Sequence, residues 1–572
     1  MLIGAISSEI QSFGAVSRER KPQRRNDGLE VRLAVPVVRA RWFRTGGLRI
    51  ALRIRVEIGR LIGMERENDP SHRTMKKRKK IIGIFAGATA ATLLTVCLTA
   101  IIRTATYPFA KLAGPDGTPD PIRPSDRAVE RLAGGIRIPT VSQAVDAREN
   151  NPFEAFKAYL PTAYPEVYKH LDSMTVNRYG LLLHWRGRDP SLRPILFCSH
   201  YDVVPVMNYD PATPDAPLPG WDYPPFSGAV ADGRIYGRGT LDMKGMLFSI
   251  LEAADALLEK GFRPERDVWI AFGFDEEIGG TEGALHIARY FKQQHIVFDA
   301  VYDEGGIIAA PGLAGIRRSV ALVGTAEKGF STLRITVYGQ GGHSSMPPAR
   351  GSLVDAAEII VRLNERQLPA HLTAPVATFL DRIGGSMGFV QRMAIANRWL
   401  LESRLLRSFE KQPATAALVR TTTAVTMARG SDAPNVLASE AEVTVNFRLL
   451  PGNTTGQVRE HVEAVCEGYR TRIEELSARE PSHISPDDVH GFEMIRNTVA
   501  GLYPGTVVTP YLTLGGTDAY KYESVSPNVF RFMPVLLTDR ERETIHNENE
   551  SISLENYGRM IAYFRNLIEN YR

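Results

Sequence analysis

Residues 195–205 read ILFCSHYDVVP, and this stretch determines the predicted fold class. An apolar run of strand length ends there in His200, Tyr201 and Asp202, as expected for a buried strand that stops at the edge of a sheet. In a parallel sheet, ligands and catalytic groups gather beyond the carboxyl ends of the strands. The stretch therefore predicts a buried sheet with chemistry at one edge.

Segments typical of strands and helices alternate along the neighbouring chain. The expected strands lie at 180–186, 194–199, 267–274 and 298–303, and the expected helices at 152–172, 243–260, 281–294 and 553–569. The helix at 243–260 has apolar residues at helical spacing and ends before Gly261, which suits a helix C-terminus. This alternation predicts an α/β fold, with a mostly parallel sheet and helices on both of its faces.

A different pattern interrupts the first from about residue 320. Its expected strands lie at 319–325, 331–339 and 441–449, and its expected helices at 352–365 and 455–469. These segments indicate a smaller α+β domain at 326–478, inserted between main-domain parts at 126–325 and 479–572. A chain of 572 residues is long enough for this, since domains hold roughly 100–200 residues each.

Residues 81–102 form an uncharged run of 22 residues, IIGIFAGATAATLLTVCLTAII. A helix of this length crosses a bilayer core of about 30 Å at about 1.5 Å per residue. We predict a transmembrane signal anchor at 81–103 and a linker at 104–125, with a cleaved signal peptide as the alternative. The positive-inside rule keeps the basic residues 76–80 cytoplasmic, so the body would be periplasmic, extracellular or lumenal.

Basic residues are concentrated in the segment 1–80, whereas the rest of the chain is near neutral or acidic. The formal net charge of +5 therefore describes the N-terminus, and the sequence gives no reason to expect nucleic-acid binding. Met75 opens the run MKKRKKIIGIF, an apt start for a signal anchor. We predict that Met75 is the true start, or else that residues 1–74 are disordered.

Four further polar segments follow strands or precede helices. They are GRGTLDMKG at 237–245, FDEEIGG at 274–280, VYDEGG at 301–306 and TIHNE at 544–548. Each alone has an ordinary explanation: Asp242 before a helix is a favoured N-cap, and Glu276 with Glu277 suits a solvated turn. Together they bring histidines and carboxylates to the ends of successive strands, where neighbouring acids need cations or protons to offset their repulsion.

Nitrogen and oxygen ligands without sulfur suit a hydrolytic zinc pair better than a structural site, with manganese and cobalt as competing cations. The three cysteines, Cys97, Cys198 and Cys466, contain no CxxC pair, which excludes a thiolate zinc site. Asp202 lies two residues after His200 on an extended chain, so it can accept a hydrogen bond from one imidazole nitrogen while the other binds metal.

In combination these motifs resemble the co-catalytic zinc carboxypeptidase and aminoacylase family, and most of all its carboxypeptidase S-like branch. The motifs follow the family's order over about residues 125–572: SHYDVVPV, GRGTLDMKG, DEEIGG, DEGG, GQGGHSSMPP and IHNENE. The resemblance implies a zinc-peptidase-like main domain, an inserted lid and dimerisation domain, and two zinc ions per subunit.

The resemblance also implies a division of labour among the ligands. His200 would bind one ion together with either Asp303 or Glu304, since branches of the family differ over that pair. Asp242 would bridge both ions.

The second ion would be bound by Glu277 and His546. Beside these ligands, Asp202 would orient the first histidine and Glu276 would be the general base.

Four residues outside the ligand set match other family positions. His343, in GGHSS, would reach the active site of a neighbouring subunit and stabilise the transition-state oxyanion. Asn435 and Arg448 would bind substrate, and a guanidinium suits a substrate carboxylate because it binds in bidentate fashion. Asp518, in GGTD, would belong to a loop that lines the substrate site.

The implied activity is that of a zinc-dependent metallocarboxypeptidase or amidohydrolase. It would cleave the amide bond next to a C-terminal amino acid of peptides or N-acyl amino acids. The alternatives are a reversible N-fatty-acyl-amino-acid synthase/hydrolase, which would use the same residues, and a non-catalytic binding member of the family. The expected partners are the substrate, a membrane through the N-terminal helix, and a second copy in a homodimer.

Overall fold

The computed structural model describes residues 70–109, 121–142, 151–313 and 316–572. The chain divides into two compact units, which we describe separately: the body, which contains Thr106–Arg572, and an N-terminal segment that contains helix α2 (Pro70–Thr106) up to Ala105. The predictions that Met75 is the true start, or else that residues 1–74 are disordered, concern a segment of which residues 1–69 lie outside the described residues.

Helix α2 contains an apolar stretch of 26 residues, Ile81–Thr106. At about 1.5 Å per residue this stretch exceeds a bilayer core of about 30 Å. Its large apolar side chains are exposed, for example Ile82 at 66% and Phe85 at 71%. The helix runs into the start of the predicted linker at 104–125. A signal sequence near the N-terminus can meet the same criteria of length and composition, so the anchor stays a prediction.

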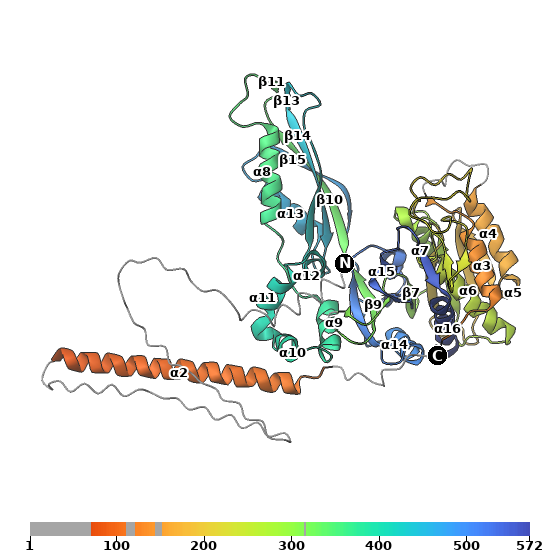
Figure 1. Cartoon of the computed structure of the whole chain (residues 1–572), viewed down its shortest axis with the longest axis horizontal. Helices are drawn as coiled ribbons and strands as arrows, with labels where there is room; N and C mark the ends of the chain where they lie inside the picture. The colour runs from red at the N-terminus through yellow and green to blue at the C-terminus, as the bar shows by residue number, and fades with distance from the viewer. Residues whose placement is uncertain (1–69, 110–120, 143–150, 314–315) are drawn as a thin grey trace. The chain divides into compact units, whose positions relative to one another are not determined.

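The body is built on a ten-stranded sheet with the order β1-β2-β6-β3-β7-β17-β9-β8-β18, in which β16 also pairs with β9 (Figure 1). The strands are β1 (Asp172–Val176), β2 (Gly180–Trp185), β3 (Ile195–His200), β6 (Val268–Gly273), β7 (Ala300–Asp303), β8 (Ile308–Ala309), β9 (Val320–Glu327), β16 (Val507–Thr513), β17 (Val529–Arg531) and β18 (Leu536–Leu537). The central run β6-β3-β7-β17 is parallel. The fold is therefore mixed α/β with a mostly parallel central sheet, as predicted.

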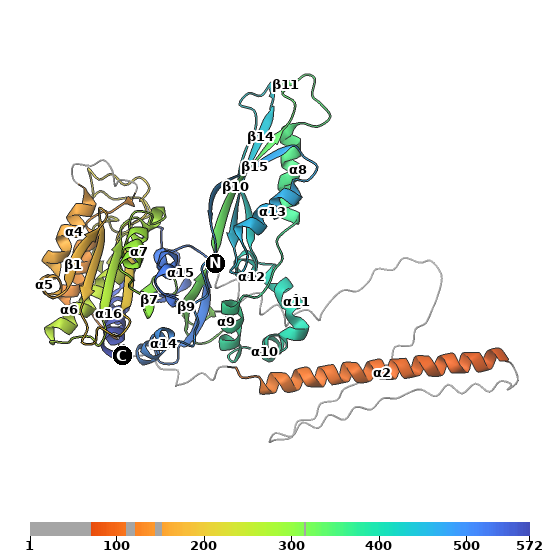
Figure 2. The same ribbon diagram turned by 180° about the vertical axis from the view of Figure 1, so that it is seen from behind.

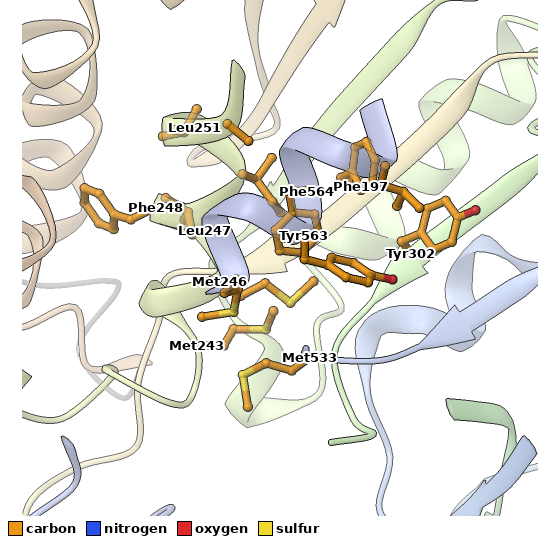
Figure 3. Close-up of a cluster of buried hydrophobic side chains, with 14 of the residues drawn as sticks. Phe197, Met243, Met246, Leu247, Phe248, Leu251, Tyr302, Met533, Tyr563 and Phe564 are labelled. Carbon is orange, nitrogen blue, oxygen red and sulfur yellow. The ribbon is translucent and has the colours of Figure 1, made fainter. Parts of the chain in front are cut away.

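Strand β3 is buried along its whole length because both faces of the sheet are covered. Ile195 and Phe197 face one apolar core, and Leu196 and Cys198 face the other. The first core contains α3 (Asp126–Ile136), α4 (Pro152–Ala163), α5 (Pro165–His170), α6 (Lys244–Glu259), α14 (His490–Leu502) and α16 (Leu554–Asn570), and the second contains α7 (Ala284–Gln293) and the 3-10 helix η4 (Asp518–Ser524). In the first core, Phe197 packs edge-on against Phe564 of α16, with ring centroids 5.6 Å apart (Figure 3).

A second, antiparallel sheet has the order β12-β14-β10-β15. Its strands are β10 (Gly329–Tyr338), β12 (Thr422–Arg429), β14 (Glu440–Leu449) and β15 (Thr471–Arg479). Helices α8 (Ser352–Glu365) and α13 (Thr455–Val465) cover one face through an apolar core of their own. A small ribbon of β11 (Gly342–His343) and β13 (Val436–Leu437) lies at the end of this sheet (Figure 1).

Four helices within the predicted inserted domain do not join the core of the second sheet. They are α9 (Ala374–Gly384), α10 (Phe389–Ala396), α11 (Arg398–Phe409) and α12 (Pro413–Val419), and they form a group beside β9 (Figure 2). Their apolar residues share a core with β9 and β16 of the central sheet. The second sheet itself spans residues 329–479, close to the predicted 326–478, while the division into domains stays a prediction.

Short elements complete the body near the end of the central sheet. They are the strands β4 (Val230–Ala231), β5 (Arg234–Tyr236) and β19 (Ser551–Ser553), the 3-10 helix η2 (Glu276–Ile278) and helix α15 (Asp539–Arg542). Strand β19 pairs with β5, so a segment near the C-terminus lies beside the segment that precedes α6.

Candidate metal centre

The neighbouring parallel strands β6, β3 and β7 end side by side, and each end carries predicted site residues. His200 is the last residue of β3, Asp303 is the last residue of β7, and Glu276 and Glu277 follow β6 within η2. A parallel arrangement puts all these carboxyl ends at one edge of the sheet. The edge predicted from the sequence is therefore where the candidate ligands meet.

His200 is almost completely buried, with 1% of its surface exposed, and carboxylates surround its ring. Its Nε2 lies 3.2 Å from Asp242 Oδ1, 3.3 Å from Glu304 Oε1 and 3.9 Å from Glu276 Oε2. Its Nδ1 lies 3.0 Å from the carbonyl oxygen of Asp202 and 3.2 Å from Asp202 Oδ1. A ring held through Nδ1 in this way presents Nε2 to the carboxylate cluster.

The second histidine of the cluster faces the other oxygen of the same aspartate. His546 Nε2 lies 2.8 Å from Asp242 Oδ2 and 3.3 Å from Glu277 Oε2. Asp242 thus stands between two histidines, with one carboxylate oxygen toward each. Each histidine also has a glutamate of its own, Glu304 on one side and Glu277 on the other.

Asp202 makes contacts that the sequence did not predict. Its carboxylate is fully buried and accepts hydrogen bonds from the backbone N–H groups of Glu276, at 3.1 Å, and Glu277, at 3.0 Å. One aspartate therefore orients His200 and also fixes the turn that presents both glutamates. Sequence reasoning missed this second role because the partners are more than seventy residues away.

Asp303 and Glu304 differ in how they lie relative to His200, a difference that the sequence did not reveal. Glu304 reaches the Nε2 atom of His200 with its side chain, and together with Glu276 they form a group whose ligand atoms lie within 4.8 Å of one another. Asp303 is buried, and its Oδ2 has no hydrogen-bond partner in the described part of the chain. Burial, reinforced by the nearby Asp518, raises the pKa of Asp303 to about 7. The geometry supports Glu304 as the ligand.

The acids of the cluster repel one another and are poorly hydrated. Burial raises the pKa of Glu304 to about 8, with a further contribution from Asp242, while His200 opposes the shift. Burial also raises the pKa of Glu276 well above its usual value. A group of acids this crowded needs positive charge or protons to be stable.

Two buried atoms of the cluster lack hydrogen-bond partners among the described residues, Nε2 of His200 and Oε1 of Glu277. Such atoms are rare in folded proteins and need a partner such as an ion. Imidazole nitrogens and carboxylate oxygens are ligands that zinc accepts. The cluster that joins His200, Asp242 and Glu277 within 4.8 Å therefore fits a metal ion chemically.

Glu550 supports the metal-site loop and was not singled out in the sequence. It is completely buried and accepts hydrogen bonds from the N–H groups of Gly239, Leu241 and Asp242 at 2.9–3.1 Å. Arg238 Nη1 donates to its other oxygen at 2.6 Å. The only available signal was its place in the motif IHNENE, four residues after His546.

The predicted residues of the second sheet lie apart from one another. His343 and Asn435 are exposed and meet at the β11–β13 ribbon, where the N–H of Ser344 donates to the carbonyl of Asn435 at 3.1 Å. Arg448 is exposed on β14, opposite Phe330 of β10. Among the described residues, the groups that can hold a metal include none of these three.

Asp518 lies next to Gly273, the last residue of β6. It is 5% exposed, and Lys521 Nζ donates to its Oδ1 at 2.5 Å. Its carboxylate lies against Gly273 and Gly280, where an added Cβ would come within 2.8 Å and 2.0 Å of its oxygens. A buried ion pair of this kind supports the strand ends, and the predicted contact of Asp518 with substrate stays a prediction.

Comparison with known proteins connects this geometry to a family. The model of peptidase family M20/M25/M40 matches residues 196–570. The probable carboxypeptidase S-like 2 of Dictyostelium discoideum is 33% identical over 485 residues, which cover 84% of this chain and 92% of that protein. The human N-fatty-acyl-amino acid synthase/hydrolase PM20D1 is 33% identical over 447 residues, which cover 77% of this chain and 87% of that protein.

The fold of the chain is also similar to that of a solved structure from this family. An M20 family metallo-carboxypeptidase, Sso-CP2 from Sulfolobus solfataricus, superposes with a TM-score of 0.57 over 78% of this chain and 99% of that chain, at 18% identity. That likeness shows a shared fold, and the sequence matches carry the relationship further. They confirm the resemblance seen in the motifs: the chain belongs to peptidase family M20/M25/M40, a family of hydrolases.

Proposed function

We propose that the protein is a two-zinc amidohydrolase that cleaves the amide bond next to a C-terminal amino acid of peptides or N-acyl amino acids. The observation that carries the proposal is the placement of Asp242, with Oδ1 3.2 Å from His200 Nε2 and Oδ2 2.8 Å from His546 Nε2. A carboxylate between two histidines, each beside its own glutamate, matches what two adjacent ions require of a protein.

In this proposal His200 and Glu304 hold one ion, His546 and Glu277 hold the other, and Asp242 serves both. When bound, two zinc ions supply an acidified water and positive charge beside the scissile carbonyl. The rest of the reaction is assigned to side chains of this chain.

Glu276 is the proposed general base. It takes a proton from the attacking water and passes it to the leaving amine, a role that suits a carboxyl group whose pKa is raised by burial. Its Oε2 lies 3.9 Å from His200 Nε2, the longest contact of that ring with the cluster, so Glu276 adjoins the ligands without sharing their closest positions.

Arg448 is the proposed carboxylate anchor of the substrate. Arg448 is exposed as a residue, but its guanidinium is partly desolvated, and this desolvation and the charge of Arg479 nearby lower the pKa of Arg448. An incoming anion would therefore stabilise its charged form. The side chains of Arg448 and Arg479 flank Phe330, each with its guanidinium carbon 5.8 Å from the ring centroid. In the described chain, Arg448 has no carboxylate partner within ion-pair distance.

His343 is proposed to act in a homodimer, where it would donate to the oxyanion in a partner's site. Its Nδ1 accepts a hydrogen bond from the N–H of Ser345 at 3.1 Å, so a neutral ring carries its proton on Nε2 and can donate from there. Asn435, which adjoins it in the ribbon, would contact the substrate from the same position.

The test of the proposed function is metal analysis combined with a hydrolysis screen. The purified full-length chain should contain about two zinc ions per subunit and release free amino acid from N-acyl amino acids or dipeptides. Chelation should abolish release, and zinc should restore it. A metal-loaded protein that hydrolyses neither substrate class would refute the proposal and favour a non-catalytic binding member of the family.

The reverse reaction, formation of N-fatty-acyl amino acids, is the second candidate. It is favoured by the 33% identity to the human protein whose name includes synthase. The same residues serve both directions, so an assay that starts from fatty acid and amino acid, and one that starts from the amide, should reach the same equilibrium mixture.

We further propose that Ile81–Thr106 anchors the protein in a membrane, with the body on the non-cytoplasmic side. The length of this stretch and the basic residues before it support the proposal. Resistance of the native protein to alkaline carbonate extraction would test the anchor, and N-terminal sequencing would show whether it is cleaved.

A further inference from the structure

The residues that directly follow the apolar stretch of α2 are held by the helices α9, α10 and α11. Tyr107 donates its hydroxyl to Asp381 Oδ1 at 2.9 Å, and Arg398 Nη2 donates to the Tyr107 hydroxyl at 3.3 Å. Arg398 also forms a bidentate pair with Asp381, at 2.6 Å and 2.9 Å. Tyr107 is therefore part of a closed network that ties α9 to α11.

Phe109 extends this attachment into the apolar core. Its ring lies so close to Gly384 of α9 that a Cβ there would come within 2.5 Å of it, and the guanidinium carbon of Arg392 lies 5.2 Å from its centroid. It packs against the core that α9, α10 and α11 share with β9 and β16. The chain thus leaves its apolar stretch and enters this group of helices within three residues.

Helices α10 and α11 expose large apolar side chains on the surface of this group. Phe389 and Trp399 are each 55% exposed, Leu400 is 47% exposed and Val390 is 37% exposed. We call these four residues the α10–α11 face. They follow one another on two consecutive helices, and large exposed apolar patches mark sites of contact with proteins or membranes.

Basic residues accompany the α10–α11 face. Residues 386–411 contain five arginines and lysines against two glutamates, a formal charge of +3. Arg404 and Arg407 are exposed, and neither forms an ion pair with any described residue. Exposed aromatic and aliphatic side chains beside unpaired arginines are typical of segments that lie in a membrane interface.

We propose that the α10–α11 face docks on the surface of the membrane that the N-terminal helix crosses. Consecutive Cα atoms are about 3.8 Å apart, so Tyr107 lies within one residue of the end of the apolar stretch at Thr106 and close to the membrane interface that this stretch reaches. Asp381 and Arg398 bind Tyr107 directly, so the chain enters the group formed by α9, α10 and α11 one residue beyond the apolar stretch, and this group is tethered to the membrane by a very short connection. The inference rests on the proposed anchor and goes beyond it, because it makes the body a second, independent membrane contact.

The test uses the full-length chain in vesicles of phosphatidylcholine and phosphatidylglycerol, with and without bromine on the acyl chains. Bromine quenches tryptophan that enters the bilayer. We expect the brominated lipid to quench mainly the fluorescence of Trp399. The total quenching should therefore drop strongly in Trp399→Phe. Trp221→Phe, which removes a half-buried tryptophan of the main domain, should leave the quenching unchanged.

Charge supplies a second measurement that does not depend on Trp399. In Arg404→Glu/Arg407→Glu the quenching should fall in vesicles that contain phosphatidylglycerol. The matched control Arg459→Glu/Arg472→Glu, which changes exposed arginines of α13 and β15, should have no such effect.

Three outcomes would overturn the proposal. One is equal quenching in the wild-type and Trp399→Phe chains, and another is equal loss in the two double variants. The third is Trp399 emission that is shielded in detergent and released when the chain becomes monomeric, which would make the face a contact between copies. Carbonate extraction reports on α2 alone, and hydrolysis on the metal centre, so failure of the anchor or of the proposed function is distinguishable from failure of docking.

Discussion

The metal cluster and the β11–β13 ribbon both carry predicted catalytic residues, but they differ in how completely one chain builds them. Each imidazole of the cluster meets two or more carboxylates within 4 Å, and His200 and Asp202 are buried. In the ribbon, His343 and Asn435 are exposed, and the only recorded side-chain partner of His343 in the described chain is Ser345. The difference teaches that one chain brings the residues of the cluster together by itself, whereas the exposed residues of the ribbon have their proposed function only in a homodimer.

The largest effect is expected from Glu276→Gln. It should lower turnover by roughly 10²–10⁴-fold, because the general base is lost while the ligands remain. Zinc content, measured by atomic emission, should stay near that of the wild type. The control Glu282→Gln changes an exposed acid of the same turn and should be silent. A fall in zinc content that matches the fall in activity would move Glu276 into the ligand set.

His343→Ala should lower turnover by roughly 10²–10³-fold, the usual loss for one oxyanion donor. Dimers mixed from His343→Ala and Glu276→Gln subunits should regain part of the activity, because one of their two sites would be intact. His286→Ala, on the surface of α7, is the matched control. Absence of complementation, with mixed dimers shown to form, would mean that His343 acts in its own subunit or not at all.

Arg448→Ala should raise KM for substrates with a free carboxylate by about 10–100-fold, as expected from loss of a hydrogen-bonded charge partner. Substrates whose carboxylate is blocked as an amide should be affected little. Arg472→Ala, on the neighbouring strand β15, should change neither value. If kcat falls and KM is unchanged for both kinds of substrate, Arg448 does not anchor the carboxylate.

Glu550→Gln should weaken metal binding by about 10–100-fold, the usual range for a residue that orients a ligand from behind. The amide cannot accept from three N–H groups and pair with Arg238 as the carboxylate does. Competition with a zinc chelator would measure the loss. The exposed Glu548 provides the matched control, Glu548→Gln. An unchanged affinity would show that the loop keeps its shape without Glu550.

The smallest effect concerns pH. In the metal-free protein, burial raises the pKa of Glu304 to about 8 and that of Asp303 to about 7. The folded state therefore holds protons that the unfolded state has lost, so stability should fall as the pH rises from about 5 to about 8, by up to about 1.4 kcal/mol per pH unit for each proton. Zinc bound at Glu304 would replace the proton of that carboxyl group, so the gap in Tm between zinc-loaded and metal-free protein should widen over the same range. A constant gap would contradict the raised pKa values.

Local patterns predicted much of the main fold. The helix expected at 352–365 is α8 (Ser352–Glu365), and the strand expected at 441–449 differs from β14 by one residue. Gly261 follows α6 with a φ of +67°, as a helix C-terminus requires. The helix expected at 152–172 is instead two helices that break at Tyr164, because Pro165 has no N–H to donate.

The sequence predicted which residues come together in the cluster, but not the contacts that they make with one another. Periodicity places His200 and the Glu276–Glu277 pair at strand ends, and the ordered motifs join them to Asp242 and His546. The choice between Asp303 and Glu304 depends on which of the two side chains turns toward the cluster. Side chains alternate between the two faces of a strand, but Glu304 lies just after the strand, where this alternation no longer predicts the direction of a side chain. The hydrogen bonds of Asp202 link segments far apart in the chain and leave no local pattern.

The hydrogen bonds that Glu550 accepts also bear on how the protein is made. Three backbone N–H groups of the loop at 239–242 find their acceptor only in a residue near the C-terminus. During synthesis, a growing chain can complete the central strands and α6 while that loop is still unpaired. The loop becomes rigid only after nearly the whole chain has emerged. Premature termination before Glu550 would remove this acceptor together with α16, which packs on the central sheet, so integrity of the centre is linked to completion of translation.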